Sequence, residues 1–241
     1  MFNYQPERIT VGMVYHYLKT NKDGTTPEHI AHYIAAPDQL VAFKYHPGEE
    51  PAAWVEATMD WHWFTAVHLE SWQLFANGDK KLIATLAYQP QLANLVVQMA
   101  WNETPFSIPM PQLPVHLYNF DLGSLNFAFH HLMQPQSRFI IGIIDPTWRE
   151  EGPPIEYKGD VEVAYVGETN RQGVACYQYQ IDGAGFAQRG GMIWVDKAGG
   201  HFQDVEIDLP DNPSWHSFKF QLQNMEQMSP TEWEAFMQAQ F

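Results

Sequence analysis

HLESWQLFANGDKKLIATLAY, residues 68–88, is the stretch that decides the fold class of this protein. Apolar and polar residues alternate in steps of two on both sides of Asn77-Gly78-Asp79, which is the pattern of a strand with one buried face. An Asn-Gly pair accommodates the positive φ angles of a tight hairpin turn. The stretch therefore predicts two antiparallel strands joined by a short turn.

The same pattern recurs at short intervals along the rest of the chain. The separators between alternating segments are NKDG (21–24), Pro37-Asp38, ETNRQG (168–173) and DKAGG (196–200), and SFKFQLQNM (217–225) makes a last strand. Many short strands with turn residues between them are typical of antiparallel sandwiches and barrels. We expect one mainly β domain over residues 1–241, a large antiparallel curved sheet or open β-barrel of about ten or more strands.

A short helix is expected at the C-terminus, in SPTEWEAFMQAQF (residues 229–241). Ser229 is placed to cap this helix, and Glu232, three residues later, completes a capping box. Trp233, Phe236 and Met237 share one helical face, and we expect that apolar stripe to pack on the sheet.

A second helix is expected in FDLGSLNFAFHHLM (residues 120–133), where Asp121 or Ser124 could provide the cap. The LNFAF part is equally compatible with a strand. Just before it, the proline-rich NETPFSIPMPQLP (residues 102–114) indicates a loop or an extended crossover.

The charge balance argues against one class of partner. The chain has 28 acidic and 13 basic residues, which gives a net charge of −15. A field of that sign repels phosphate backbones and anionic lipid surfaces, so nucleic-acid binding is not expected. The single cysteine, Cys176, cannot form an intramolecular disulfide, and its alternating neighbours indicate a small buried apolar role.

The sequence gives no sign of a membrane segment. The N-terminal MFNYQPERITVGMVYHYL lacks the basic and apolar regions of a signal peptide, and no apolar run reaches the roughly 18 residues that cross a bilayer. We therefore expect a soluble protein, cytoplasmic as the sequence stands, or periplasmic if a signal peptide has been removed.

Residues 54–70 are interpreted as one long strand, bent or bulged near Thr65. Alternation gives this strand an apolar inner face and a polar outer face. The inner set is Val55, Ala57, Met59, Trp61, Trp63, Thr65, Val67 and Leu69, and the outer set includes Asp60, His62, His68 and Glu70.

The inward-facing residues of the predicted sheet are rich in aromatic side chains, which suits a cavity for an apolar or amphipathic small molecule. A solid core is the alternative, because protein interiors are normally close-packed. For a cavity we expect two polar anchors, Arg189 and His201, and an aromatic wall made by Trp61, Trp63, Tyr177, Tyr179 and Trp194.

A catalytic alternative rests on histidine. Asp60 and His62 are two residues apart on the predicted strand, so their side chains would point the same way and could form an acid–base pair. The adjacent His130 and His131 are a second source of such a group. The sequence contains no recognised metal-binding, nucleotide-binding or nucleophile motif, so no metal or other cofactor is expected.

Three functions remain open on these patterns. The one we favour is non-enzymatic binding of an apolar or amphipathic small molecule inside the curved sheet. The second is an enzyme that acts on a small molecule in the same cavity. The third is an interaction module that forms a homodimer through an aromatic sheet face.

The late hairpin GFAQRGGMIWVDKAGGHFQDVEIDLPDN (residues 185–212) is similar to bacterial proteins of the DUF3108 type and, more distantly, to LolA- and LolB-like lipoprotein carriers. The shared pattern is carried here by Gly191, Ile193, Trp194, Val195 and Asp196, followed by a turn and a strand. The resemblance covers about residues 155–225. It implies an incomplete antiparallel barrel, LolA-like or lipocalin-like in outline, with a helix against its concave face, where those carriers hold acyl chains.

Overall fold

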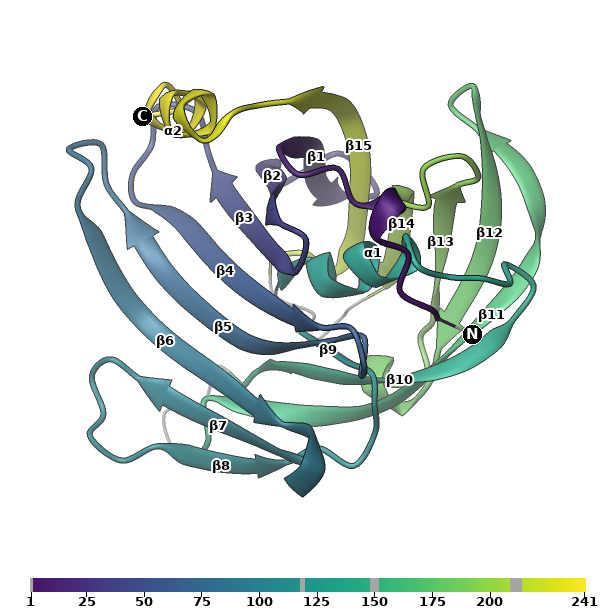
Figure 1. The fold of residues 1–241 in the computed structure, drawn as a ribbon, viewed down its shortest axis with the longest axis horizontal. Coiled ribbons are helices and arrows are strands. Elements are labelled where there is room, and N and C mark those ends of the chain that lie inside the picture. The colour runs from purple at the N-terminus through teal and green to yellow at the C-terminus, as the bar shows by residue number, and fades with distance from the viewer. Residues whose placement is uncertain (1, 118–119, 148–151, 209–213) are drawn as a thin grey trace.

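A computed structural model describes residues 2–117, 120–147, 152–208 and 214–241 of the chain. It shows one continuous sheet of fifteen strands curled around a short helix (Figure 1). The strand order is β8-β7-β6-β5-β4-β3-β2-β1-β15-β14-β13-β12-β11-β10-β9. Neighbouring strands run antiparallel, apart from the parallel pair β9 and β10. The predicted fold class, a mainly β chain with a large curved antiparallel sheet, is confirmed.

The sheet has two arms, and within each arm every strand lies beside its neighbour in the chain. The first arm is β1 (Met13–Asn21), β2 (Glu28–Ala36), β3 (Gln39–Tyr45), β4 (Ala52–Asp60), β5 (Thr65–Leu74), β6 (Lys80–Gln89), β7 (Asn94–Met99) and β8 (Phe106–Pro109). The second arm is β9 (Val115–Leu117), β10 (Arg138–Pro146), β11 (Ile155–Arg171), β12 (Val174–Asp182), β13 (Gly191–Asp196), β14 (Phe202–Asp208) and β15 (Ser217–Gln227). Antiparallel pairing of β1 with β15 joins the two arms.

The hairpin predicted from residues 68–88 is present as β5 and β6. Gly78 has a φ of +85°, and the backbone N–H of Phe75 donates to the Asp79 carbonyl at 3.0 Å. This positive φ is the one that the Asn-Gly pair was expected to supply. The pairs β2–β3, β11–β12 and β13–β14 are likewise the hairpins that the turn signals predicted.

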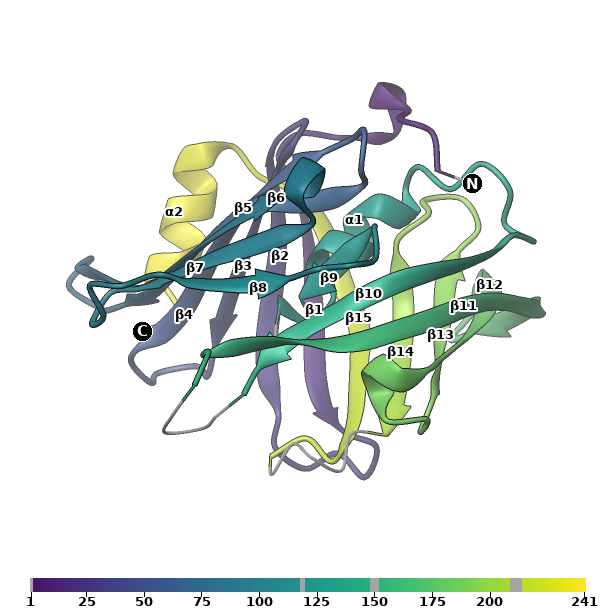
Figure 2. The ribbon, with the colours of Figure 1, turned by 90° about the horizontal axis from the view of Figure 1, so that it is seen from below.

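The chain connection between the two ends of the sheet explains why the sheet curls. β8 and β9 are the outermost strands, one at each end, yet only residues 110–114 separate them in the sequence. A connection of that length spans at most roughly 20 Å. The two ends must therefore approach each other, and Figure 2 shows β8 lying close to β10 and β11. The proline-rich stretch 102–114 thus contains an edge strand as well as the crossover.

The helix α1 (Gly123–Phe129) fills the inside of the curled sheet (Figure 1), and all seven of its residues are buried. This confirms a helix, rather than a strand, at LNFAF. Neither predicted cap is used, because the N-cap position is Leu122 and no side chain caps the helix. Three short 3-10 turns complete the described backbone: Pro6–Arg8, Pro90–Leu92 and Ala184–Phe186.

The helix α2 (Pro230–Gln238) packs on the outer face of β1–β4 (Figure 1). The expected capping box is present, with Ser229 Oγ accepting from the Glu232 backbone N–H and the Glu232 carboxylate accepting from the Ser229 backbone N–H. Trp233 stacks on Tyr33 with ring centroids 4.8 Å apart. A second apolar cluster therefore lies on the convex side of the sheet, separate from the barrel interior.

The interpretation of residues 54–70 as one long strand is wrong. The chain turns at residues 61–64, and β4 and β5 pair antiparallel with Thr58 opposite His68. Phe64 has a φ of +50°, and Asp60 Oδ1 accepts the His62 backbone N–H at 2.8 Å. An aspartate that accepts a hydrogen bond from the backbone two residues ahead initiates a turn. Asp60 was therefore the residue in the sequence that could have indicated the turn.

Candidate functional site

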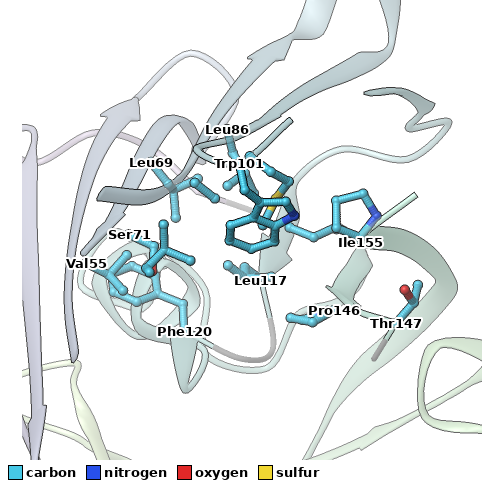
Figure 3. A pocket seen from close by; sticks show the side chains of 14 residues that line it. Val55, Leu69, Ser71, Leu86, Trp101, Leu117, Phe120, Pro146, Thr147 and Ile155 are labelled. Carbon is cyan, nitrogen blue, oxygen red and sulfur yellow. The ribbon is translucent and has the colours of Figure 1, made fainter. Parts of the chain in front are cut away.

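A cavity of about 300 Å³ lies where the two ends of the sheet approach each other. The described residues that line it come from β4–β7 on one side and from β9 and the β10–β11 connection on the other (Figure 3). An apolar cavity of about 150 Å³ is large enough to hold benzene. This space is thus sufficient for a ligand about twice that size.

The first wall of the cavity is the concave face of β4–β7. Val55, Leu69, Leu86 and Met99 each come from a different one of these four strands. Their alternation along the strands places them on the face that also carries the main core. The wall is therefore continuous with the main core, and its side chains are buried.

The opposite wall belongs to the other end of the sheet. Leu117 of β9, Pro146 at the end of β10 and Ile155 at the start of β11 face the first wall (Figure 3). Phe120, which is fully buried and lies just before α1, lines the cavity beside Val55. The cavity exists only because the sheet is curled, since its two walls are distant in strand order.

Few polar groups line the cavity, and none of its described lining residues is charged. The Thr147 hydroxyl donates to the Pro153 carbonyl at 2.9 Å, so its proton is engaged within the protein. Trp101, whose surface is 71% exposed, contributes its indole ring to the lining. The surroundings therefore suit an uncharged, apolar part of a molecule.

A smaller, separate space lies beside this cavity, toward the barrel interior. It shares Leu69 and Leu117 with the larger cavity and reaches Ser124 of α1. Its volume of about 10 Å³ is close to that of a single water probe. A narrow chain could enter it only if the lining side chains moved.

Next to the interior helix lies a cluster of buried charges. Lys19 Nζ is 2.7 Å from Glu28 Oε2 and 3.2 Å from Asp121 Oδ1, and Lys44 Nζ is 2.5 Å from Asp121 Oδ2. Burial alone would raise the pKa of Asp121, but the charges of Lys19 and Lys44 outweigh it and hold the pKa below its usual value. Both Asp121 and Leu122 have positive φ angles, 50° and 52°. The ion pairs thus hold a strained backbone at the start of α1.

Four buried histidines surround α1 in their neutral form. Burial lowers the pKa of His32 and His131 to about 4 and that of His116 and His130 to about 3. His116 Nδ1 lies 2.9 Å from Ser124 Oγ. At neutral pH these rings act as polar core side chains. None of them is among the described residues that line the cavity between the sheet ends.

The seven residues expected to bind a ligand are dispersed over the molecule, and none is among the described lining of this cavity. Trp61 packs against the main core, and its ring stacks on that of Tyr4 with centroids 5.2 Å apart. Trp63 packs beside His62, with ring centroids 4.6 Å apart. Both tryptophans belong to the β4–β5 turn instead of a continuous inner face.

The other expected residues belong to the second arm. Tyr177 and Tyr179 do face inward, toward a different cavity. Trp194 does not, because its ring lies on the convex face under the Arg171 guanidinium, 4.1 Å away. Arg189 is exposed in a turn, and His201 is buried with its ring 5.1 Å from that of Tyr15.

The proposed acid–base pair of Asp60 and His62 has a structural role in this geometry. The Asp60 carboxylate accepts the backbone N–H of His62, and the exposed imidazole packs on Trp63. Within the described part of the chain, no group of three histidine, cysteine or acidic side chains is placed to hold a metal ion. The same residues include no helix that is long and apolar enough to cross a membrane.

Comparison with solved structures identifies the fold. A β-barrel-like protein of the domain of unknown function DUF1849 from Brucella abortus superposes with a TM-score of 0.51 at 11% identity, covering 91% of this chain and 98% of that one. A DUF1329 protein from Desulfovibrio piger (TM-score 0.30, 9% identity, 92% and 88% covered) and an outer membrane lipoprotein-sorting protein domain from Vibrio parahaemolyticus (0.27, 6%, 94% and 91%) are more distant. No protein-family model and no curated protein matches the sequence. The class defined here is a β-barrel-like fold, and the particular resemblance to DUF3108 is not among these matches.

Sequence reasoning did not single out the residues that line the cavity between the sheet ends. Leu86 and Met99 were visible as apolar positions of alternating strands, but nothing distinguished them from ordinary core. Trp101 lies next to the proline-rich stretch and is exposed close to the edge strand β8. This tryptophan is the one local indication of the cavity. The position of the cavity depends on which two strands lie at the ends of the sheet.

Proposed function

We propose that this protein binds one apolar or weakly amphipathic small molecule, without chemical change, in the cavity between the two ends of its sheet. The observation that carries the proposal is the cavity itself, about 300 Å³ in volume and lined largely by apolar side chains. Native interiors are close-packed, so an apolar space of this size in contact with the surface is typical of a ligand site.

The geometry favours binding over catalysis. The described lining contains no acid, base or charged side chain. A ligand would be held by burial of its apolar surface, worth about 25 cal/mol per Å². The polar part of an amphipathic ligand would remain near Trp101 and Thr147.

The first test is native mass spectrometry of the freshly purified protein, repeated after extraction with organic solvent. We expect an additional mass that disappears on extraction. The emptied protein should then bind the apolar fluorescent probe N-phenyl-1-naphthylamine in a saturable manner, with one probe per chain.

Two variants on one strand test whether the ligand binds in this cavity. Ala84 and Ala87 both belong to β6, but Ala84 lines the cavity and Ala87 lies on the opposite face. Ala84→Trp should fill the cavity and abolish probe binding, whereas Ala87→Trp should leave it unchanged. Equal probe binding by both variants would contradict the proposed site.

A further inference from the structure

A second cavity, of about 220 Å³, lies at a different place in the barrel. It is formed between the C-terminal end of α1 with the residues that follow it, the strands β12 and β13, and Arg8. Its described lining has no residue in common with that of the first cavity. The two cavities are therefore separate potential sites.

One side of the second cavity is aromatic and apolar. Tyr177 and Tyr179 project from β12, Val195 from β13 and Phe129 from α1. The rings of Phe129 and Tyr179 meet edge to face, with centroids 5.3 Å apart. Rings held in this way make a rigid surface against which another ring or a branched apolar chain can pack.

The other side carries a cation, Arg8, and an anion, Asp196. No described contact pairs these two charges with each other. The guanidinium of Arg8 has no ion pair among the described residues, and Arg8 is exposed. Asp196 Oδ1 accepts the backbone N–H groups of Ala198 and Gly199 at 2.6 and 2.9 Å. Its Oδ2 lies 3.9 Å from His201 Nε2. The third charged lining residue, Lys197, is already paired with Glu168 at 2.7 Å.

We propose that this cavity binds a free α-amino acid with a large apolar side chain. The carboxylate of the amino acid pairs with the Arg8 guanidinium, which offers two parallel N–H donors. Its ammonium pairs with Asp196 Oδ2, and its side chain lies against Tyr177, Tyr179 and Phe129. A zwitterion fits a site with one charge of each sign, and the cavity volume suits a single ring, since about 150 Å³ already holds benzene.

The test compares three chemically matched probes by isothermal titration calorimetry at low ionic strength. L-phenylalanine carries both charges, 3-phenylpropionate lacks the ammonium and phenethylamine lacks the carboxylate. We expect L-phenylalanine to bind one per chain, at least about tenfold more tightly than either analogue, because each charged contact contributes at least a factor of that size.

Two variants then assign the charges. Arg8→Gln should weaken L-phenylalanine and 3-phenylpropionate about tenfold and leave phenethylamine unchanged, and Asp196→Asn should weaken L-phenylalanine and phenethylamine and leave 3-phenylpropionate unchanged. Each variant thus keeps one probe that reports an intact fold. Arg189→Gln, at an exposed arginine outside the cavity, should change none of the three affinities.

The proposal is overturned if L-phenylalanine shows no saturable binding, or if 3-phenylpropionate or phenethylamine binds as tightly as L-phenylalanine. It is also overturned if Ala84→Trp, which fills the first cavity, abolishes L-phenylalanine binding while Arg8→Gln does not. Loss of naphthylamine binding in Ala84→Trp with unchanged L-phenylalanine binding would support two separate sites.

Discussion

The hydroxyl oxygen of Thr65 accepts a hydrogen bond of 2.9 Å from the backbone N–H of Val115, and both residues are buried. Thr65 begins β5, and Val115 begins β9, the strand at the far end of the sheet. This bond joins two parts of the sheet that no backbone ladder connects. It fixes the wall that carries Leu117 against the wall that carries Leu69.

Replacing Thr65 should therefore destabilise the closed arrangement. Thr65→Val keeps the side-chain shape but leaves the Val115 N–H buried without its partner, at a cost of about 1–3 kcal/mol. Urea unfolding measures this loss, and Thr65→Ser, which keeps the hydroxyl, is the matched control. A Thr65→Val protein as stable as the Thr65→Ser protein would show that the bond does not hold the two ends together.

The buried ion pairs of Asp121 lead to a second prediction. Asp121→Asn removes the counter-charge that Asp121 supplies to the buried ammonium groups of Lys19 and Lys44, so we expect a loss of about 3–5 kcal/mol in unfolding free energy. The exposed pair Lys22–Asp208, at 2.7 Å, provides the comparison. Asp208→Asn should cost about 1 kcal/mol or less. A smaller loss for Asp121→Asn than for Asp208→Asn would rule out this role.

The neutral buried histidines predict how stability depends on pH. Their folded-state pKa values of about 3 to 4 lie below the unfolded value of about 6.5, so the unfolded chain binds protons first. Stability should be fully present above pH 6.5 or so and fall as the pH drops toward 4, by up to about 1.4 kcal/mol per pH unit for each histidine.

Denaturant unfolding between about pH 7 and pH 5 measures this slope. His116→Gln should make this slope shallower, because it removes one of the histidines whose pKa is lowered by burial. The prediction is wrong if the wild-type protein has the same stability at both ends of that range.

The exposed indole of Trp101 should contribute to ligand affinity. Trp101→Ala removes an aromatic surface from the cavity lining, and we expect N-phenyl-1-naphthylamine to bind about tenfold more weakly. Leu92 is equally exposed, at 72%, but does not line the cavity. Leu92→Ala should therefore leave the titration unchanged, and an equal effect of both variants would indicate nonspecific adsorption of the probe.

Local patterns predicted the elements whose determinants are close in the sequence. The β5–β6 hairpin followed from alternation and from Gly78, and α2 followed from the capping box of Ser229 and Glu232. The β4–β5 turn was missed because Trp61 and Phe64 are not turn-forming residues, and alternation continues through them by chance. The cap of α1 was misassigned because Asp121 bonds to lysines of distant strands, which no local rule includes.

The sequence by itself determined that this chain folds as a large antiparallel sheet, since strand periodicity and turn chemistry act over a few residues. Only the tertiary structure decided which strands end the sheet, how far it curls and where the two proposed binding cavities lie. Those properties depend on contacts between residues far apart in the chain, such as Thr65 with Val115. The type of each residue does not indicate which distant residue it will contact. The facing sheet ends that line the first cavity, and the grouping of Tyr177 and Tyr179 with Phe129 in the second, depend on contacts of this kind.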